Sequence, residues 1–311
     1  MSAPSPVPEG GRFAWLRTMD GVKLRAACWS GKMPVATVVL LQGRTEYIEK
    51  YYETIVELRS RGYAVAAFDW RGQGLSDRAL ADRHKGHVRD FGEYHRDLDC
   101  VLENFIQKDP DLPEPYIVMA HSMGGHIAVR YLHDRPTMFS RAVLCSPMAY
   151  INTAPLPNFI ARVIANVGSA MGLTESYVPG GKAYTRDGEP FAGNLLTGDA
   201  QRFARNADML DDNPELALGS ATIGWLHGAL RSIDMVMDPA YGAAITCPAI
   251  LFYGAQEQVS SPEKQSLLAS QMGQCQAVCI NDARHEILQE TDDIRAQFWS
   301  AFDRFMKRSA A

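Results

Sequence analysis

The fold of this 311-residue chain is decided by the run Tyr116-Ile-Val-Met-Ala-His-Ser122-Met-Gly-Gly-His126. An apolar stretch typical of a β-strand stops at a serine, and a stretch typical of a helix begins just after it. A tight strand-to-helix turn of this kind exposes the serine Oγ and directs backbone N–H groups at the same point. The residues two before and two after the serine must be small; Gly124 is, and Ala120 costs one methyl of clearance. The alternative is a buried strand with a chance serine before two glycines.

Short apolar runs alternate with helix-length amphipathic segments along most of the chain. Two alternating runs, 12–18 and 23–29, are joined through Met19-Asp-Gly21, which is a hairpin signal. A hairpin followed by βαβ alternation predicts an α/β protein with a mostly parallel, doubly wound sheet and helices on both faces. The further strands are expected at 36–41, 64–68, 116–120, 141–145, 249–253 and 277–280. The helices are expected near 48–59, 92–107, 124–132, 262–271 and 293–307.

One interval breaks this alternation. Between residues 147 and 241 the chain shows helical patterns with Pro and Gly punctuation and no clear strand, and it is too long for a loop. It is therefore expected to be a helical cap, which divides the α/β core into 12–146 and 242–311. Residues 1–11 are rich in proline and lack the basic head and apolar stretch of a signal peptide, so a disordered leader is expected.

Composition excludes several classes of function. The net charge of −5 argues against nucleic-acid binding, which usually requires a basic face. No apolar run approaches the roughly 20 residues of a transmembrane helix. Cys275 and Cys279 are spaced C-x₃-C, but no second pair completes a zinc site, so neither metal nor cofactor is expected. The six scattered cysteines indicate reduced thiols and a cytoplasmic protein. Transient contact with the inner face of a membrane is a separate expectation.

Serine is a weak nucleophile and needs a base within hydrogen-bond reach, which in turn needs an orienting acid. In the fold expected here these partners follow in the order serine, acid, histidine. Of the eight histidines, only His227 and His285 follow residue 133. His285 comes directly after an expected strand and is the candidate base for Ser122. His227 lies inside the helical interval and is assigned to packing or the pocket wall.

The acid is expected after the strand that precedes the histidine loop. Glu257 is the only carboxylate between the end of strand 249–253 and the next helix. Glutamate is one methylene longer than aspartate, so its loop should lie slightly farther back. Asp282, three residues before His285 in the same loop, is the rival.

An oxyanion hole needs two N–H donors. One is expected from Met123, the residue after the nucleophile, and the other from Arg44, where Gly43 permits a tight turn. Each such donor lowers the barrier by roughly 3 kcal/mol. The Arg44 side chain has two interpretations, an anchor for an anionic substrate group or a salt bridge to Glu46 or Glu49.

The segment Asp69-Trp-Arg71-Gly72-Gln-Gly74-Leu-Ser76-Asp77 follows strand 64–68 and is dense in turn-forming residues. It lacks the G-K-[ST] of a P-loop and the G-x-G-x-x-G of a dinucleotide site. The prediction is a structural turn in which Asp69 and Arg71 pair and brace the floor of the active site.

Taken together, these motifs resemble the α/β-hydrolase superfamily, and within it the bacterial lysophospholipase-like members of the lysophospholipase and monoacylglycerol lipase branch. The resemblance implies a cap after the sixth strand and supports Ser122, His285 and Glu257. Gln42 stands where many relatives have histidine, and this departure, like Ala120 and Glu257, fits the bacterial subgroup. The motifs that carry the resemblance are Gln42-Gly-Arg-Thr-Glu-Tyr-Ile-Glu-Lys, Phe68-Asp-Trp-Arg-Gly-Gln-Gly-Leu-Ser, Ala120-His-Ser-Met-Gly-Gly and Ala283-Arg-His-Glu-Ile-Leu.

The expected function is that of a serine hydrolase that cleaves carboxylic esters through an acyl-enzyme. The substrate would be a small lipid-like ester such as a lysophospholipid or monoacylglycerol. Cap residues expected to line an acyl pocket are Leu156, Phe159, Ile160, Val163, Ile164, Met171 and Trp225, with Phe159, Ile160 and Trp225 as the candidates for substrate binding.

Two other functions compete with this one. An aminopeptidase or proline iminopeptidase-like amidase would need cap carboxylates to hold a substrate ammonium, and the cap has a cluster of four: Asp208, Asp211, Asp212 and Glu215. A catalytically silent binding protein on the same fold is the second alternative, and an intact set of Ser122, Glu257 and His285 argues against it.

Overall fold

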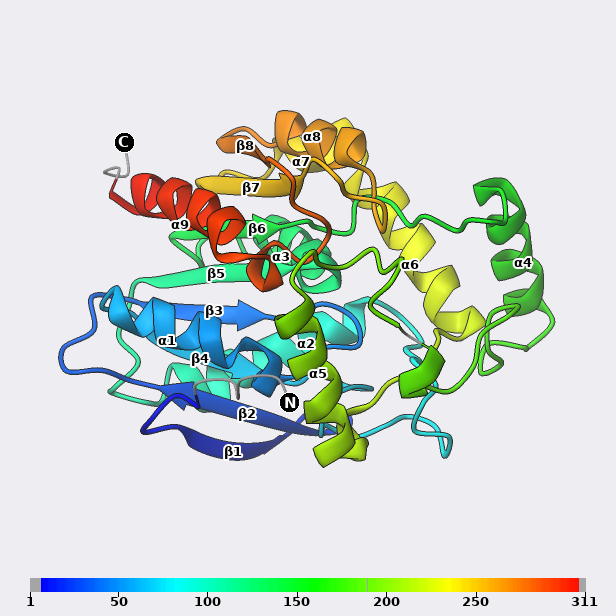
Figure 1. The fold of residues 1–311 in the computed structure, drawn as a ribbon, viewed down its shortest axis with the longest axis horizontal. Coiled ribbons are helices and arrows are strands. Elements are labelled where there is room, and N and C mark those ends of the chain that lie inside the picture. Colours follow the sequence, from blue (N-terminus) through cyan, green and yellow to red (C-terminus); the bar gives the residue numbers. More distant parts are fainter. Residues whose placement is uncertain (1–6, 189, 308–311) are drawn as a thin grey trace.

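The computed structural model describes residues 7–188 and 190–307. Within them, one eight-stranded sheet has the order β1-β2-β4-β3-β5-β6-β7-β8. Strand β2 pairs antiparallel with both neighbours and all other pairings are parallel, so β2 alone runs against the rest. The α/β fold with a mostly parallel sheet is therefore confirmed (Figure 1). The strands are β1 (Arg12–Arg17), β2 (Lys23–Trp29), β3 (Thr37–Leu41), β4 (Ala64–Phe68), β5 (Tyr116–His121), β6 (Arg141–Cys145), β7 (Ala249–Gly254) and β8 (Cys275–Ile280).

Helices cover both faces of this sheet (Figure 1). On one face α1 (Tyr52–Ser60) and α9 (Asp292–Lys307) share an apolar cluster with strand side chains that include Val38 and Leu40 of β3 and Ile250 and Phe252 of β7. On the other face α2 (Gly92–Val101), α3 (Ser122–Asp134) and α8 (Pro262–Gln271) share a second cluster, which includes Val39 and Leu41 of β3 and Leu251 of β7. Because successive strand residues point to opposite faces, burial on both faces requires the continuous apolar runs that the sequence shows.

The interval between β6 and β7 is helical. It holds α4 (Asn158–Ala170), α5 (Ala200–Asp212), α6 (Ile223–Val236) and α7 (Pro239–Ala243), so the expected boundary at residue 241 falls inside α7. We refer to residues 147–241 as the cap segment. Helix α6 joins the core cluster of α2 and α3 through Trp225, Ala229 and Ile233. Helix α4 packs on α6 and lies far from the sheet (Figure 1).

The expected leader, residues 1–11, falls partly outside the described residues, since the structure describes none of 1–6. From residue 7 onward the chain contacts the core. The Trp29 Nε1 donates to the Pro8 carbonyl at 3.2 Å, and Arg59 Nη1 donates to the Glu9 carbonyl at 2.8 Å.

Candidate active site

Ser122 lies at the junction of β5 and α3, as the opening motif predicts. Its φ of 49° is in the left-handed region, which is costly for a residue with a side chain and is typical of a strained functional turn. Gly124 lies against the end of β3, and a Cβ there would overlap the carbonyl oxygens of Leu41 and Gln42. Glycine at 124 is therefore required for the turn to approach the sheet.

Three loops at the carboxyl edge of the sheet bring Ser122, His285 and Glu257 into one hydrogen-bonded chain. Ser122 Oγ lies 2.9 Å from His285 Nε2, and His285 Nδ1 lies 2.6 Å from Glu257 Oε2. Ser122, Glu257 and His285 follow β5, β7 and β8; β7 and β8 are adjacent, and one strand, β6, separates β5 from β7. Since His285 and Glu257 are both buried, their contact is shielded from water.

The environment of Glu257 keeps it ionised. Burial alone would raise its pKa, but the charge and hydrogen bond of His285 and two backbone N–H groups lower the pKa to about 2. Those N–H groups belong to Val259 and Ser260, at 2.8 and 3.0 Å from Oε1. An ionised Glu257 can accept a hydrogen bond from the Nδ1–H of His285, and in this tautomer the unprotonated Nε2 faces Ser122 Oγ.

The rival acid lies elsewhere. Asp282 is exposed in the turn after β8, with a φ of 60°. The other downstream histidine, His227, is half-buried on α6 and is not among the described residues that line the cavity over Ser122.

The two residues expected to supply oxyanion donors, Met123 and Arg44, line the same cavity as Ser122. Met123 is in the first turn of α3, where backbone N–H groups have no partner within the helix and favour negative charge. Gly43, before Arg44, packs so closely that a Cβ would lie 2.7 Å from Glu46 Oε2 and 2.9 Å from His121 Nδ1.

Of the two interpretations of the Arg44 side chain, the salt bridge to Glu46 or Glu49 is not formed among the described residues. Glu46 pairs with Lys50 at 3.0 Å and Glu49 with Arg25 at 2.6 Å. Arg44 instead extends toward the cap segment, where Nη2 donates to the Gly219 carbonyl at 2.6 Å and the guanidinium lies 5.3 Å from the centre of the Trp225 ring. It therefore links a core loop to the cap segment.

The expected pairing of Asp69 with Arg71 is also wrong. Asp69 is fully buried and bonds to Arg25, with Nε at 2.8 Å from Oδ2. Arg71 turns the other way and binds Asp97 at 2.6 Å and Asp20 at 2.8 Å. Each side chain is thus held by a partner from another element, Asp69 by Arg25 of β2 and Arg71 by Asp97 of α2.

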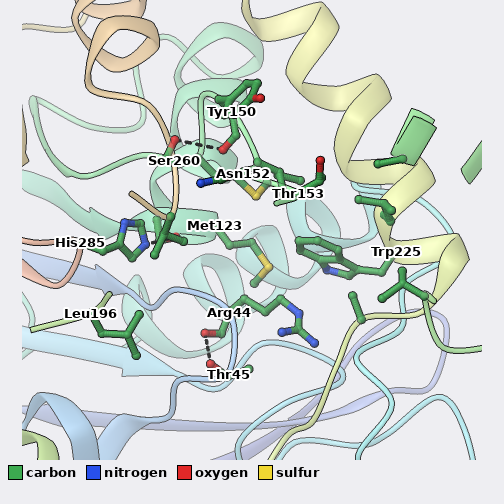
Figure 2. A pocket seen from close by; sticks show the side chains of 18 of the residues that line it. Arg44, Thr45, Met123, Tyr150, Asn152, Thr153, Leu196, Trp225, Ser260 and His285 are labelled. Atoms are coloured by element: carbon green, nitrogen blue, oxygen red, sulfur yellow. Dashed lines mark hydrogen bonds between the residues drawn. The ribbon is translucent and has the colours of Figure 1, made fainter. Parts of the chain in front are cut away.

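An apolar cavity of about 410 Å³ lies over Ser122, between the core loops and the cap segment. Figure 2 shows Arg44, Met123, Trp225 and His285 around it. Its apolar wall includes Trp225, Leu156 and Ile164, as expected. The sequence missed several loop residues of this wall, because loops carry no periodicity that marks an inward face: Met148, Tyr150, Val178, Leu196 and Val259.

The other expected pocket residues of the cap lie outside this wall. Phe159 is 68% exposed and Val163 and Met171 are exposed, while Ile160 is half-buried and not among the described lining residues. Helix α4 presents its small residues, such as Ala161 and Ala165, to the interior. Phe159, Val163 and Val167, which are spaced four residues apart, therefore lie together on the outer face of α4.

The acidic cluster of the cap does not reach the cavity. Asp208 and Asp211 both pair with Arg186, and none of the four carboxylates is among the described lining residues. Within the described residues, no group of three or more His, Cys, Asp or Glu side chains could hold a metal ion. In that same part of the chain, no helix has the length and apolar character needed to cross a bilayer.

Known hydrolases are similar to this chain in sequence and in fold. A family model described as "Serine aminopeptidase, S33" matches residues 32–292. The chain is 31% identical over 298 residues to lysophospholipase L2 of Escherichia coli K12, covering 93% of this chain and 86% of that protein. It is 26% identical over 244 residues to a monoacylglycerol lipase of Mycolicibacterium smegmatis, covering 78% and 77%. A monoglyceride lipase structure from Saccharomyces cerevisiae, a soluble variant with a substrate analogue, has the same fold, with a TM-score of 0.78, 17% identity and 98% of each chain covered.

Proposed function

The chain belongs to the family described as serine aminopeptidase, S33, with the α/β-hydrolase fold, and from this premise we propose that it cleaves carboxylic esters through an acyl-enzyme. It is an ester hydrolase of the lysophospholipase and monoacylglycerol lipase branch, which the sequence resemblance predicted. The observation that carries the proposed mechanism is the hydrogen-bonded chain of Ser122, His285 and Glu257, at 2.9 and 2.6 Å.

In the proposed mechanism Ser122 Oγ attacks the ester carbonyl while His285 Nε2 takes its proton. The N–H groups of Met123 and Arg44 hold the oxyanion that forms. His285 then protonates the departing alcohol, and Glu257 stabilises the imidazolium during this transfer. Water, activated by His285, finally cleaves the acyl group from Ser122.

The proposed substrates are monoacyl esters such as lysophospholipids and monoacylglycerols, because one apolar cavity adjoins Ser122. We assign the acyl chain to this cavity, between Met148 of the core and Trp225 and Ile164 of the cap segment. Each buried methylene contributes about 0.8 kcal/mol, so KM should fall with acyl length until the cavity ends and then level off.

The proposal extends to a cytoplasmic enzyme that touches the inner face of a membrane transiently. Its support is the outer face of α4, where Phe159, Val163, Val167 and Met171 are all exposed. Helix α4 carries no acidic residue, and its one charged residue, Arg162, pairs with Asp234. An apolar helix face with this composition suits the boundary between head groups and acyl chains. A cap domain over residues 147–241 is part of the same proposal.

The aminopeptidase alternative has support from the family description alone. It would require a free carboxylate in the cavity to hold a substrate ammonium. Among the described residues, the acidic side chains that line the cavity are Glu46 and Glu286, and both pair with Lys50, at 3.0 and 2.6 Å. Both carboxylates are thus already engaged by Lys50, which favours an ester over a cationic amide.

The decisive experiment measures ester hydrolysis and fluorophosphonate labelling of the wild type and of Ser122→Ala. Hydrolysis by the variant should fall by several orders of magnitude and labelling should disappear, with an unchanged melting temperature. Substrates should include p-nitrophenyl esters from acetate to palmitate, lysophosphatidylcholine, triolein and a proline naphthylamide. Retained turnover in Ser122→Ala would refute the mechanism, and a preference for triolein or the naphthylamide would refute the substrate class.

A further inference from the structure

The glycine-rich turn at residues 69–77 has no part in the proposed mechanism. It forms hydrogen bonds with the loop that carries Arg44. Strands β3 and β4 are adjacent and parallel, so the loops that follow them lie side by side at the carboxyl edge of the sheet. The turn is held tight by Gly72, with a φ of 81°, and Gly74, with a φ of 56°. A Cβ at Gly74 would overlap the Asp69 carboxylate, so the curl also depends on glycine there.

Hydrogen bonds from three side chains of the turn reach the neighbouring loop. Trp70 Nε1 donates to the Gln42 carbonyl at 3.0 Å, and the Ile48 N–H donates to Asp69 Oδ1 at 3.0 Å. Between these two, Gln73 Nε2 donates to the carbonyls of Gly43 at 2.7 Å and Glu46 at 3.1 Å. Gln73 is 3% exposed, so these bonds are sheltered from water.

The bond from Gln73 to Gly43 bears directly on the expected oxyanion donor. The carbonyl of Gly43 and the N–H of Arg44 belong to one planar trans peptide, and they point in opposite directions. Whatever fixes the carbonyl therefore fixes the N–H. The preceding peptide is held as well, because the Gly43 N–H donates to Glu46 Oε2. Arg44 is among the described residues that line the cavity, and Gln73 is not. Gln73 therefore contacts the Gly43–Arg44 peptide from the side that faces away from the cavity.

We propose that Gln73 is a positioning residue, which orients the Gly43–Arg44 peptide so that the Arg44 N–H is aimed at the oxyanion. This inference rests on the proposed function, which gives that N–H its role. A donor aimed at developing charge stabilises the transition state more than the bound ester. Loss of the Gln73 amide should therefore lower kcat and leave KM nearly unchanged.

The test compares Gln73→Met, which keeps the length of the side chain without its donor, with Gln73→His, whose ring N–H has a similar reach. Removing one oxyanion donor costs about 10²–10³ in kcat, so misaiming it should cost roughly tenfold to a hundredfold. The Ki of an alkyl trifluoromethyl ketone, which forms an oxyanion on the serine, should rise by the same factor. Gln73→His should recover most of both losses.

The matched control is Gln271→Met. Gln271 also donates through Nε2 to a backbone carbonyl, that of Met237 at 3.4 Å, but between α8 and the end of α6. This variant should keep the wild-type kcat. Should Gln73→Met fail to fold, Gln73→Asn, which withdraws the amide by one methylene, is measured in the same way and should lose several-fold in kcat.

Normal kcat in a folded Gln73→Met, a rise in KM alone, or a Gln73→His as slow as Gln73→Met would overturn the inference. Ser122→Ala is assayed beside these variants. Activity retained there would refute the proposed function, whereas a dead Ser122→Ala with a normal Gln73→Met would refute this inference alone.

Discussion

The core and the cap segment differ in the interactions that hold their helices and strands in place. In the core, β3, β4 and β5 are buried along their whole length, and helices cover both faces of the sheet. In the cap segment, α4 leaves apolar side chains exposed, and α5 is fastened to the core by charges. Arg202 and Arg205 of α5 bind Glu53 of α1 at 2.6 and 2.9 Å. A packed core holds atoms in place with little freedom, whereas ion pairs with some exposure to water each contribute little stability.

This difference separates two kinds of residue. Side chains proposed to perform the chemistry come from loops anchored in the core. Side chains proposed to select the substrate, such as Trp225 and Ile164, come from the cap segment. Core changes should therefore alter kcat for every ester, and cap changes should alter the preference among esters.

The largest effect is expected from the carboxylate behind His285. Glu257→Gln should lower kcat by about 10³–10⁴ for every ester, because the amide would favour the wrong tautomer of His285. Asp282→Asn should stay close to the wild type, since Asp282 is exposed in its turn. Steady-state kinetics on a short and a long p-nitrophenyl ester would measure both. A greater loss of kcat in Asp282→Asn than in Glu257→Gln would show that the acid comes from the loop after β8 and not from the loop after β7.

A cap change should act on acyl length instead. Ile164→Trp narrows the cavity from the α4 side, so kcat/KM for palmitate should fall roughly tenfold or more, which equals the loss of about two buried methylenes. Hydrolysis of acetate should be unchanged. Equal losses on acetate and palmitate would show that the cap segment takes part in the chemistry and does not act on substrate preference alone.

The outer face of α4 should matter only at a lipid surface. Phe159→Ser combined with Val163→Ser should reduce hydrolysis of lysophosphatidylcholine in phospholipid vesicles several-fold, because less apolar area enters the interface. Soluble p-nitrophenyl acetate serves as the control and should be cleaved at the wild-type rate. Unchanged hydrolysis and unchanged vesicle binding in a flotation assay would exclude this face as the contact surface.

The smallest effect concerns the charge pairs that fasten α5. Burial acts to raise the pKa of Glu53, but the Arg202 hydrogen bond and the charges of Arg295, Arg202 and Arg205 lower it from 4.5 to about 2. A carboxylate with a lowered folded pKa stabilises the fold above pH 4.5 and loses this contribution as the pH falls toward 2. Glu53→Gln should therefore melt a few degrees below the wild type at pH 7.

That difference should narrow as the pH falls from 4.5 toward 2, as thermal melts across the range would show. The pairs are partly exposed, so added salt should narrow the difference too. A gap between the two proteins that is constant in pH would mean that Glu53 contributes through packing and not through charge.

The sequence by itself determined the order and type of the elements, and with them the fold. The spacing of apolar residues, every two residues in a half-buried strand and about every 3.6 in a helix, is a local property of the sequence. Strands buried on both faces are visible as continuous apolar runs. Strand β8 shows the limit of this signal, since it begins at Cys275, two residues earlier than expected. As an edge strand it is largely exposed and includes the polar Gln276, so its first residues do not form an apolar run. The sequence also singled out Ser122, Glu257 and His285, because loops that follow parallel strands converge on one edge of a sheet. The structure brings these three side chains into contact.

Only the tertiary structure decided which side chains meet across the molecule. Asp69 binds Arg25 and Arg71 binds Asp97, partners 44 and 26 residues apart, and no local pattern selects one arginine over another for a buried carboxylate. The outer position of Phe159 was hidden for a related reason: periodicity reveals that a helix has an apolar face but not which neighbour, if any, covers it. Nothing in the sequence indicated the role proposed for Gln73, because its partner is the backbone carbonyl of Gly43. Every residue has a backbone carbonyl, and only the packing of adjacent loops determines which one Gln73 contacts.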